Sequence, residues 1–154
     1  MKRLIALILV ASLILGTQIV GVSGKTFKKK GKYETGIMCT KKRGKKLKKY
    51  VLKNSVKNKC GYVGRTKLKN NTLTTWGTWL YKNNGKKKYY KYRKYKFKLS
   101  PYIEYYEWMP NYNAGYHLER MSNRAGRNIL RHSQGSGFTF YVKYGKVYKI
   151  TLGG

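Results

Sequence analysis

Apolar and basic residues alternate between residues 90 and 99. The apolar positions are Tyr90, Tyr92, Tyr95, Phe97 and Leu99, and the basic positions between them are Lys91, Arg93, Lys94, Lys96 and Lys98. A period of two is typical of a β-strand that buries one face. The alternation slips by one residue at Arg93–Lys94, which predicts a β-bulge at that point. We therefore expect a half-buried strand whose exposed face carries a row of positive charges.

A second alternating stretch, near the C-terminal end, predicts a β-hairpin. Its two strands are marked by Phe138, Phe140, Val142 and Tyr144 and by Tyr148, Ile150 and Leu152. Gly145 lies between them, where a tight turn is needed. The best helical candidate, residues 119–131, has no convincing apolar stripe, and Gly126 interrupts it. The pattern therefore predicts an all-β fold.

The first residues have the features of a secretion signal. A basic start, Met1 to Arg3, precedes the apolar run from Leu4 to Leu15, and small residues follow up to Gly24. This order predicts a signal peptide over residues 1–24 and a protein secreted to the cell wall or cell surface. The alternative is an uncleaved signal-anchor in the plasma membrane, because the stretch up to Val22 is nearly long enough to span a bilayer.

The chain is strongly basic. Its 154 residues include 36 Lys and Arg but only 4 acidic residues, and the formal net charge is +32. A chain with this imbalance repels itself, which predicts an anionic partner outside the cell. The densest basic cluster is the candidate polyanion-binding site: Lys86, Lys87, Lys88, Lys91, Arg93, Lys94, Lys96 and Lys98. Because lysine binds phosphate as a point charge, we expect loose and salt-sensitive binding.

Residues 25–49 are dominated by Lys and Gly, with few apolar residues to anchor them. We expect one or two docked strands from these anchors: Phe27, Tyr33, Ile37, Met38 and Leu47. The only cysteines are Cys39 and Cys60, and an even pair in an exported protein predicts a disulfide. The alternative is two free buried thiols. Two thiols without clustered histidines do not make a zinc site, and we expect no metal and no cofactor.

The rest of the chain contains a weak internal repeat. The first copy, residues 50–100, opens with Tyr50 to Leu52 as a strand, and the second copy, residues 116–154, opens with Tyr116 to Leu118. Each copy continues with a basic Asn/Gly turn, a Leu-basic step and two aromatic strands joined by a Gly-Lys turn. An aromatic connector, residues 101–115, separates the copies. This order predicts one or two small β modules.

The repeat also carries a family resemblance. Its best stretches, residues 66–92 and 123–150, contain Leu68-Lys69, Thr74-Thr75-Trp76, Gly85 to Tyr92, Leu130-Arg131, Phe138-Thr139-Phe140 and Gly145 to Ile150. The order resembles the surface-layer-protein-associated (SLAP) domains of lactobacilli. The resemblance implies small β-barrels similar to bacterial Src-homology-3-like modules. It also implies non-covalent attachment to a Gram-positive cell wall, with anionic wall polymers as the ligand.

Catalytic chemistry has little support in the sequence. Glu104 and Glu107 lie close together among aromatic residues, as a sugar hydrolase would need, but an acidic pair in so basic a chain is better explained by neutralisation of nearby lysines. We therefore predict a non-enzymatic protein with no small-molecule substrate. Tyr105, Tyr106 and Trp108 are equally compatible with stacking on a ligand and with burial, whereas Trp76 and Trp79 fit a core.

The leading hypothesis is an exported protein that holds to teichoic-acid-like wall polymers through a lysine-rich β surface. A second class is a cationic antimicrobial or bacteriocin-like protein that acts on anionic membranes. A third class is an extracellular adhesin for nucleic acid or glycosaminoglycan. Charge alone does not separate these polyanions.

Overall fold

A computed structural model describes residues 24–58, 60–111 and 115–153. The predicted signal peptide lies outside the described residues, except for Gly24. Within the described ranges, neither helix has the length and apolar character that a membrane crossing requires.

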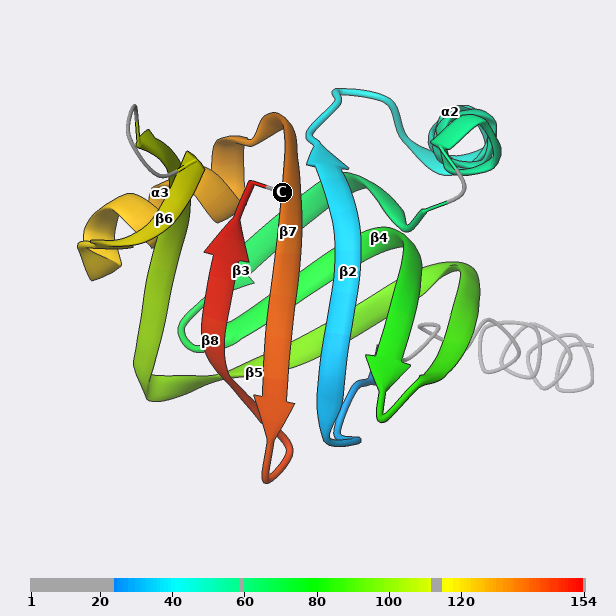
Figure 1. The fold of residues 1–154 in the computed structure, drawn as a ribbon. Helices are drawn as coiled ribbons and strands as arrows, with labels where there is room; N and C mark the ends of the chain where they lie inside the picture. The colour runs from blue at the N-terminus through cyan, green and yellow to red at the C-terminus, as the bar shows by residue number, and fades with distance from the viewer. Residues whose placement is uncertain (1–23, 59, 112–114, 154) are drawn as a thin grey trace, which may run out of the picture.

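The described residues form one eight-stranded sheet and two helices (Figure 1). The elements in chain order are β1 (Lys25–Thr26), β2 (Gly31–Met38), α2 (Gly44–Asn58), β3 (Tyr62–Lys69), β4 (Thr72–Asn83), β5 (Lys86–Asn111), β6 (Gly115–Met121), α3 (Asn123–His132), β7 (Gln134–Lys143) and β8 (Lys146–Leu152). The prediction of a mainly β fold is confirmed, and the two helices are additions to it.

The long strand β5 organises the sheet. Its first half pairs antiparallel with β4, and its second half pairs parallel with β8 and antiparallel with β6. The remaining strands follow the order β4-β3-β2-β7-β8, so the path of strand pairing begins and ends on β5. Strands from both predicted modules, 50–100 and 116–154, therefore belong to the same sheet.

The sheet folds over itself into two layers. In Figure 1, β2, β7 and β8 run side by side in front, while β3, β5 and the first part of β4 cross behind them. Aromatic side chains from both layers meet in the space between, as the rings of Trp79 and Phe140 do at a centroid distance of 5.0 Å. One cluster fills this space, and it includes Phe27, Tyr33, Ile37, Trp79, Phe97, Phe140 and Ile150. Phe27, Tyr33 and Ile37 thus dock as the sequence predicts.

Helix α2 replaces a predicted strand. Tyr50 to Leu52 was expected to open the first repeat copy as β structure, and that expectation is wrong. Leu47, Val51 and Ser55 are spaced four residues apart, which gives a helix one buried stripe on an otherwise basic surface. The stripe packs on Gly64 of β3, where an added Cβ would lie 2.8 Å from Leu47 Cδ1. Leu47, Val51 and Tyr62 form a second, smaller cluster on the outside of the sheet.

Helix α3 was also missed by the all-β prediction. Ser122 caps its first turn by accepting a hydrogen bond from the Ala125 amide at 3.2 Å. Leu130 is fully buried, and Gly126 lets the helix approach the ring of Tyr105 closely. The buried residues of α3 are Gly126 and Leu130. Because glycine has no side chain, the sequence shows only a weak apolar stripe.

The predicted bulge exists, but it lies earlier than expected. Gly77 of β4 is opposite Arg93 and Trp79 is opposite Tyr90, so β5 holds one extra residue between positions 90 and 93. The slip was predicted at Arg93–Lys94. The hairpin between β7 and β8 turns at Tyr144 and Gly145, with φ values of 50° and 72°, as a tight two-residue turn requires.

The predicted disulfide is wrong, because Cys39 and Cys60 are both free and partly buried. The Gly36 amide donates to the Gly61 carbonyl, so Cys60 lies near Gly36, and Cys39 lies three residues farther along the chain. Three extended residues span about 10 Å, whereas bridged cysteines keep their Cα atoms within about 7 Å. The Cys39 Sγ atom instead lies 3.5 Å from the Thr66 hydroxyl.

Candidate polyanion-binding surface

The eight predicted binding residues all lie on β5, but they do not form one surface. Tyr95, Phe97 and Leu99 point into the core, so Lys94, Lys96 and Lys98 point outward. Arg93 is opposite Gly77 and one residue from Lys94, which directs it to the other face. The bulge before it separates Lys86, Lys87, Lys88 and Lys91 from the remaining residues.

The three outward lysines of β5 lie across β4 from three basic residues of β3. Trp76, Thr74 and Thr72 of β4 lie directly opposite Lys94, Lys96 and Lys98. On their other side, the same three β4 residues lie opposite Arg65, Lys67 and Lys69. We call the six cations the basic grid: Arg65, Lys67, Lys69, Lys94, Lys96 and Lys98.

The basic grid has the dimensions of an extended groove. Rows two residues apart along a strand are about 7 Å apart, and columns two strands apart are about 10 Å apart. Thr72, Thr74 and Trp76 of β4 form the floor, and longer basic side chains form both walls. The groove has a volume of about 460 Å³ and is also lined by Asn70. The two basic columns run along the strands, an arrangement that matches a linear chain better than a compact ligand.

One end of the basic grid is fixed by an aromatic contact. A bulge at Val63–Arg65 inserts an extra residue in β3, so that Gly64 meets α2 while Arg65 lies over Trp76. The Arg65 guanidinium is 4.6 Å from the centre of the Trp76 ring. Such a contact holds the guanidinium in place while leaving its charge available.

Helix α2 packs beside this end of the groove and carries further lysines, none of which lines the groove itself. Trp76 and Tyr92 pack against its buried stripe from the outer face of the sheet. Lysines on the exposed side of the helix are Lys45, Lys46, Lys48, Lys49 and Lys53. Burial raises the pKa of the Tyr92 hydroxyl above its ordinary value.

Acidic side chains lie elsewhere. Glu34 forms an ion pair with Lys82 at 2.6 Å, and Glu104 forms one with Arg120 at 3.5 Å. Glu107 and Glu119 lie opposite each other on β5 and β6. Because these four are all the acidic residues of the chain, no carboxylate lines the groove of the basic grid.

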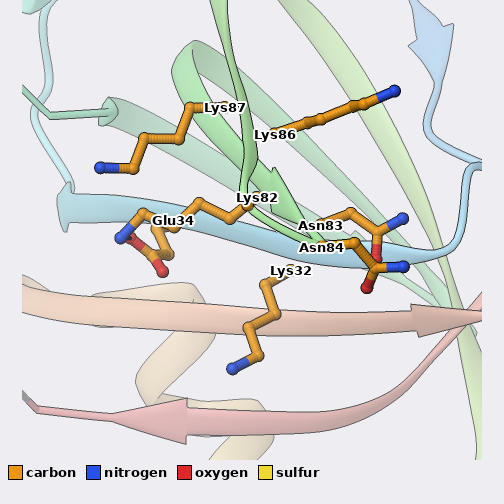
Figure 2. A pocket seen from close by; sticks show the side chains of 8 residues that line it. Lys32, Glu34, Lys82, Asn83, Asn84, Lys86 and Lys87 are labelled. Atoms are coloured by element: carbon orange, nitrogen blue, oxygen red, sulfur yellow. Dashed lines mark ion pairs between the residues drawn. The ribbon is translucent and has the colours of Figure 1, made fainter.

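The other predicted cations are arranged differently. Lys86 and Lys87 line a separate hollow of about 450 Å³ at the β4–β5 hairpin, beside the ion pair of Glu34 with Lys82. Figure 2 shows Lys86 and Lys87 extending in different directions from this hairpin. The Lys88 Nζ atom lies 5.6 Å from the centre of the Tyr90 ring. Lys91 is exposed, and its carbonyl accepts a hydrogen bond from the Tyr95 hydroxyl at 2.5 Å.

The three candidate stacking residues differ in exposure. Tyr105 is 1 % exposed and belongs to the core, so it is not available to a ligand. Tyr106 is partly buried, with its hydroxyl 3.4 Å from Glu104. Trp108 is 39 % exposed and faces a hollow that also contains Cys60. Trp79 is fully buried, as predicted, and Trp76 is partly buried.

The glutamate pair that suggested hydrolysis is split by the strand. Glu104 and Glu107 are three residues apart on continuous β5, and side chains at odd spacing point to opposite faces. Two carboxyl groups on opposite faces do not act on one glycosidic bond.

Half of the basic grid was missed from the sequence. Arg65, Lys67 and Lys69 alternate with Thr66 and Leu68, which is the same period-two signal that revealed the lysines of β5. Their run is shorter and contains fewer cations than the stretch from Lys86 to Lys98. Only the strand register shows that the two sets form the walls of one groove.

Three comparisons, with protein-family models, with curated proteins and with solved structures, gave no match to this chain.

Proposed function

We propose that the protein is exported and non-enzymatic, and that it holds to a phosphate-bearing wall polymer of the teichoic-acid type through the basic grid. The observation that carries this proposal is the groove between β3 and β5. Five of the six grid cations line this groove around Thr72, Thr74 and Trp76, Lys98 continues the β5 column, and no glutamate lies among them. A linear polyanion in this groove would contact both walls along its length.

Counterion release supplies the driving force. Each phosphate that a lysine or arginine neutralises releases condensed cations, and for single-stranded polymers this changes log K by about −0.7 per contact for each tenfold increase in salt. Six contacts give a slope of about −4, so raising salt fourfold weakens binding by several hundredfold. The proposal therefore requires binding that is strong in dilute buffer and lost in concentrated salt.

The predominance of lysine in the basic grid supports recognition of the ligand by its charge rather than by a specific arrangement of its groups. Five of the six grid cations are lysines, which bind phosphate without the fixed geometry of a guanidinium fork. The threonine hydroxyls offer hydrogen bonds to phosphate oxygens at any position along the chain. Such a site tolerates a polymer of irregular length and substitution.

The resemblance to SLAP domains supports the same ligand class and remains part of the proposal. It implies small barrels of the Src-homology-3 type. The path of strand pairing that returns to β5 is compatible with closure of that kind. Wall attachment follows from the resemblance and the predicted signal peptide together.

Paired charge-neutralising variants test the proposal. Lys67→Gln/Lys96→Gln removes two charges beside Thr74, whereas Arg124→Gln/Arg131→Gln removes two exposed charges from α3. We expect the first variant to bind purified teichoic acid more weakly and to reduce the salt slope by about 1.4, following the same relation per contact. The second variant should retain the slope of the unmodified protein. Equal loss in both variants would show that overall charge, not the groove, binds the polymer.

Two other functions remain as alternatives, and each has a direct test. The hairpin of β5 and β6 exposes Trp108, Tyr116 and Leu118, which favours contact with a membrane interface. Dye release from anionic vesicles would support an antimicrobial role, because wall binding alone releases none. Competition among teichoic acid, DNA and heparin at physiological salt would rank the wall polymer against nucleic acid and glycosaminoglycan.

A further inference from the structure

We propose that the protein has a second polyanion site on its other layer and bridges two phosphodiester polymers. This inference rests on the proposed function, because it assigns the basic grid to the first polymer. The second site, which we call the basic row, crosses five strands on their outer face. Its members are Lys149 of β8, Tyr141 of β7, Lys32 of β2, Lys82 of β4 and Lys87 of β5.

Strand register places the basic row in one line. Tyr141 lies opposite Lys149 on one side and opposite Lys32 on the other. Lys32 in turn lies opposite Lys82, and Lys82 lies opposite Lys87. Directly opposite residues in antiparallel strands share a face, so all five side chains point away from the core that Tyr33 and Phe140 enter.

Contacts within the basic row hold the cations in place. The ammonium groups of Lys149 and Lys32 lie 4.3 Å and 5.5 Å from the centre of the Tyr141 ring. Lys82 forms an ion pair with Glu34, and Figure 2 shows that pair with Lys32 and Lys87 around it. A second carboxylate, that of Glu104 on β5, lies beside Lys149 and forms its ion pair with Arg120. Among the described residues, Lys32 and Lys87 form no ion pair with a carboxylate.

Charge repulsion in the basic row points to an anionic ligand. Lysines directly opposite each other across paired strands destabilise a sheet. Adjacent strands are about 4.8 Å apart, which is shorter than the Debye length of about 8 Å, so salt does not screen these neighbours. A phosphate placed between two such lysines would remove the repulsion. The ion pair of Lys82 with Glu34 offsets part of this repulsion, and a phosphate beside Lys32 and Lys87 would offset more of it.

The two sites face away from each other. The basic grid lies outside the layer of β3, β4 and β5, and the basic row lies mainly outside the layer of β2, β7 and β8 (Figure 1). Two packed layers are about 10 Å apart before the side chains are added, which exceeds a Debye length. Occupation of one site leaves the other site charged and open. Two polymer chains would thus be linked through one protein molecule.

A bridging assay separates this inference from the proposed function. Thymidine oligonucleotides that carry either a donor or an acceptor dye serve as the phosphodiester probe, mixed with limiting amounts of the full chain in dilute buffer. We expect energy transfer with the unmodified protein and with Arg124→Gln/Arg131→Gln. Lys32→Gln/Lys87→Gln should still bind one probe, but its energy-transfer signal should be at least fivefold weaker than that of the unmodified protein. Lys149→Gln provides a second variant at the same site. Sedimentation at the same concentrations tests that the bridging species contains one protein molecule.

The possible results lead to different conclusions. Binding without energy transfer in the unmodified protein overturns the bridging proposal and leaves the basic grid in place. Energy transfer that the basic-row variants retain at the level of the α3 control overturns the second site. Sedimentation of the bridging species as a protein oligomer also overturns it. No binding of either the oligonucleotide or purified glycerol-phosphate polymer overturns the proposed function itself.

Discussion

The close contact between α3 and β5 predicts that Gly126→Ala destabilises the protein. A methyl group at this position would overlap the Cγ atom of Tyr105 and lie 2.7 Å from its Cβ atom. Tyr105 cannot move aside, because it is 1 % exposed and lies at the centre of the packed core. The helix must therefore shift away from the sheet.

The expected cost follows from opposing terms. Overpacking of a filled core destabilises by about 1–3 kcal/mol. Alanine favours a helix over glycine by about 1 kcal/mol, which offsets part of that cost. Complete detachment of α3 would cost more, because it would expose Leu130, whose burial is worth about 1.5–3 kcal/mol, and break the hydrogen bond from Thr66. We expect a net destabilisation of about 1–2 kcal/mol from the balance of these principles.

Urea unfolding measures this effect. With a urea dependence of about 2 kcal/mol per molar, the midpoint should fall by about 0.5–1 M. Asn128→Ala lies on the exposed side of α3 and should leave the midpoint unchanged or slightly higher. In a Tyr105→Ala background, which removes the overlapping Cγ and Cδ1 atoms, Gly126→Ala should cost less than it does in the unmodified protein, because the two residues are in contact. If Gly126→Ala behaves like Asn128→Ala, the close approach of α3 to β5 is refuted.

Three further predictions concern single side chains. Thr66→Val removes a hydroxyl that donates to the Leu130 carbonyl at 2.6 Å, and we expect a loss of about 1 kcal/mol in the same urea assay; an unchanged midpoint would contradict this. Burial raises the pKa of Tyr95 to about 12, so stability should be complete below the unfolded value near pH 10 and fall as pH rises toward 12. Ultraviolet absorbance of tyrosinate, followed during alkaline unfolding, measures this pH dependence. Ionisation of the buried tyrosine before the protein unfolds would contradict the prediction. Cys39 and Cys60 should each react with a thiol reagent when the protein is unfolded in the absence of a reductant. An intact mass lower by two hydrogens, as a disulfide would give, would contradict free thiols.

The alternating stretches carried most of what could be predicted about the strands. The half-buried part of β5 and the β7–β8 hairpin follow from a period of two, because each has one face in the core and one in solvent. The position of the bulge was missed because two aromatic residues of β5 point to opposite faces. Tyr90 packs on the main core, whereas Tyr92 packs under α2.

The helices and the groove depend on contacts between distant segments. The buried stripe of α2 consists of few residues in a lysine-rich stretch, so its periodicity is weak until the glycine of β3 that receives it is known. The basic grid likewise requires that β3 and β5 lie on either side of β4. Charge patterning identified the lysines of β5 but not their partners, because register is a property of pairs of strands.

The dual pairing of β5 has a consequence for how the chain reaches its native state. Until β8 has been made, the second half of β5 lacks one neighbour, and β7 has an open edge beside it. Contacts between segments this far apart in sequence form slowly, and unpaired edges promote association between unfinished chains. A ribosome-bound chain would therefore depend on its net charge, rather than on completed structure, to stay apart from its neighbours.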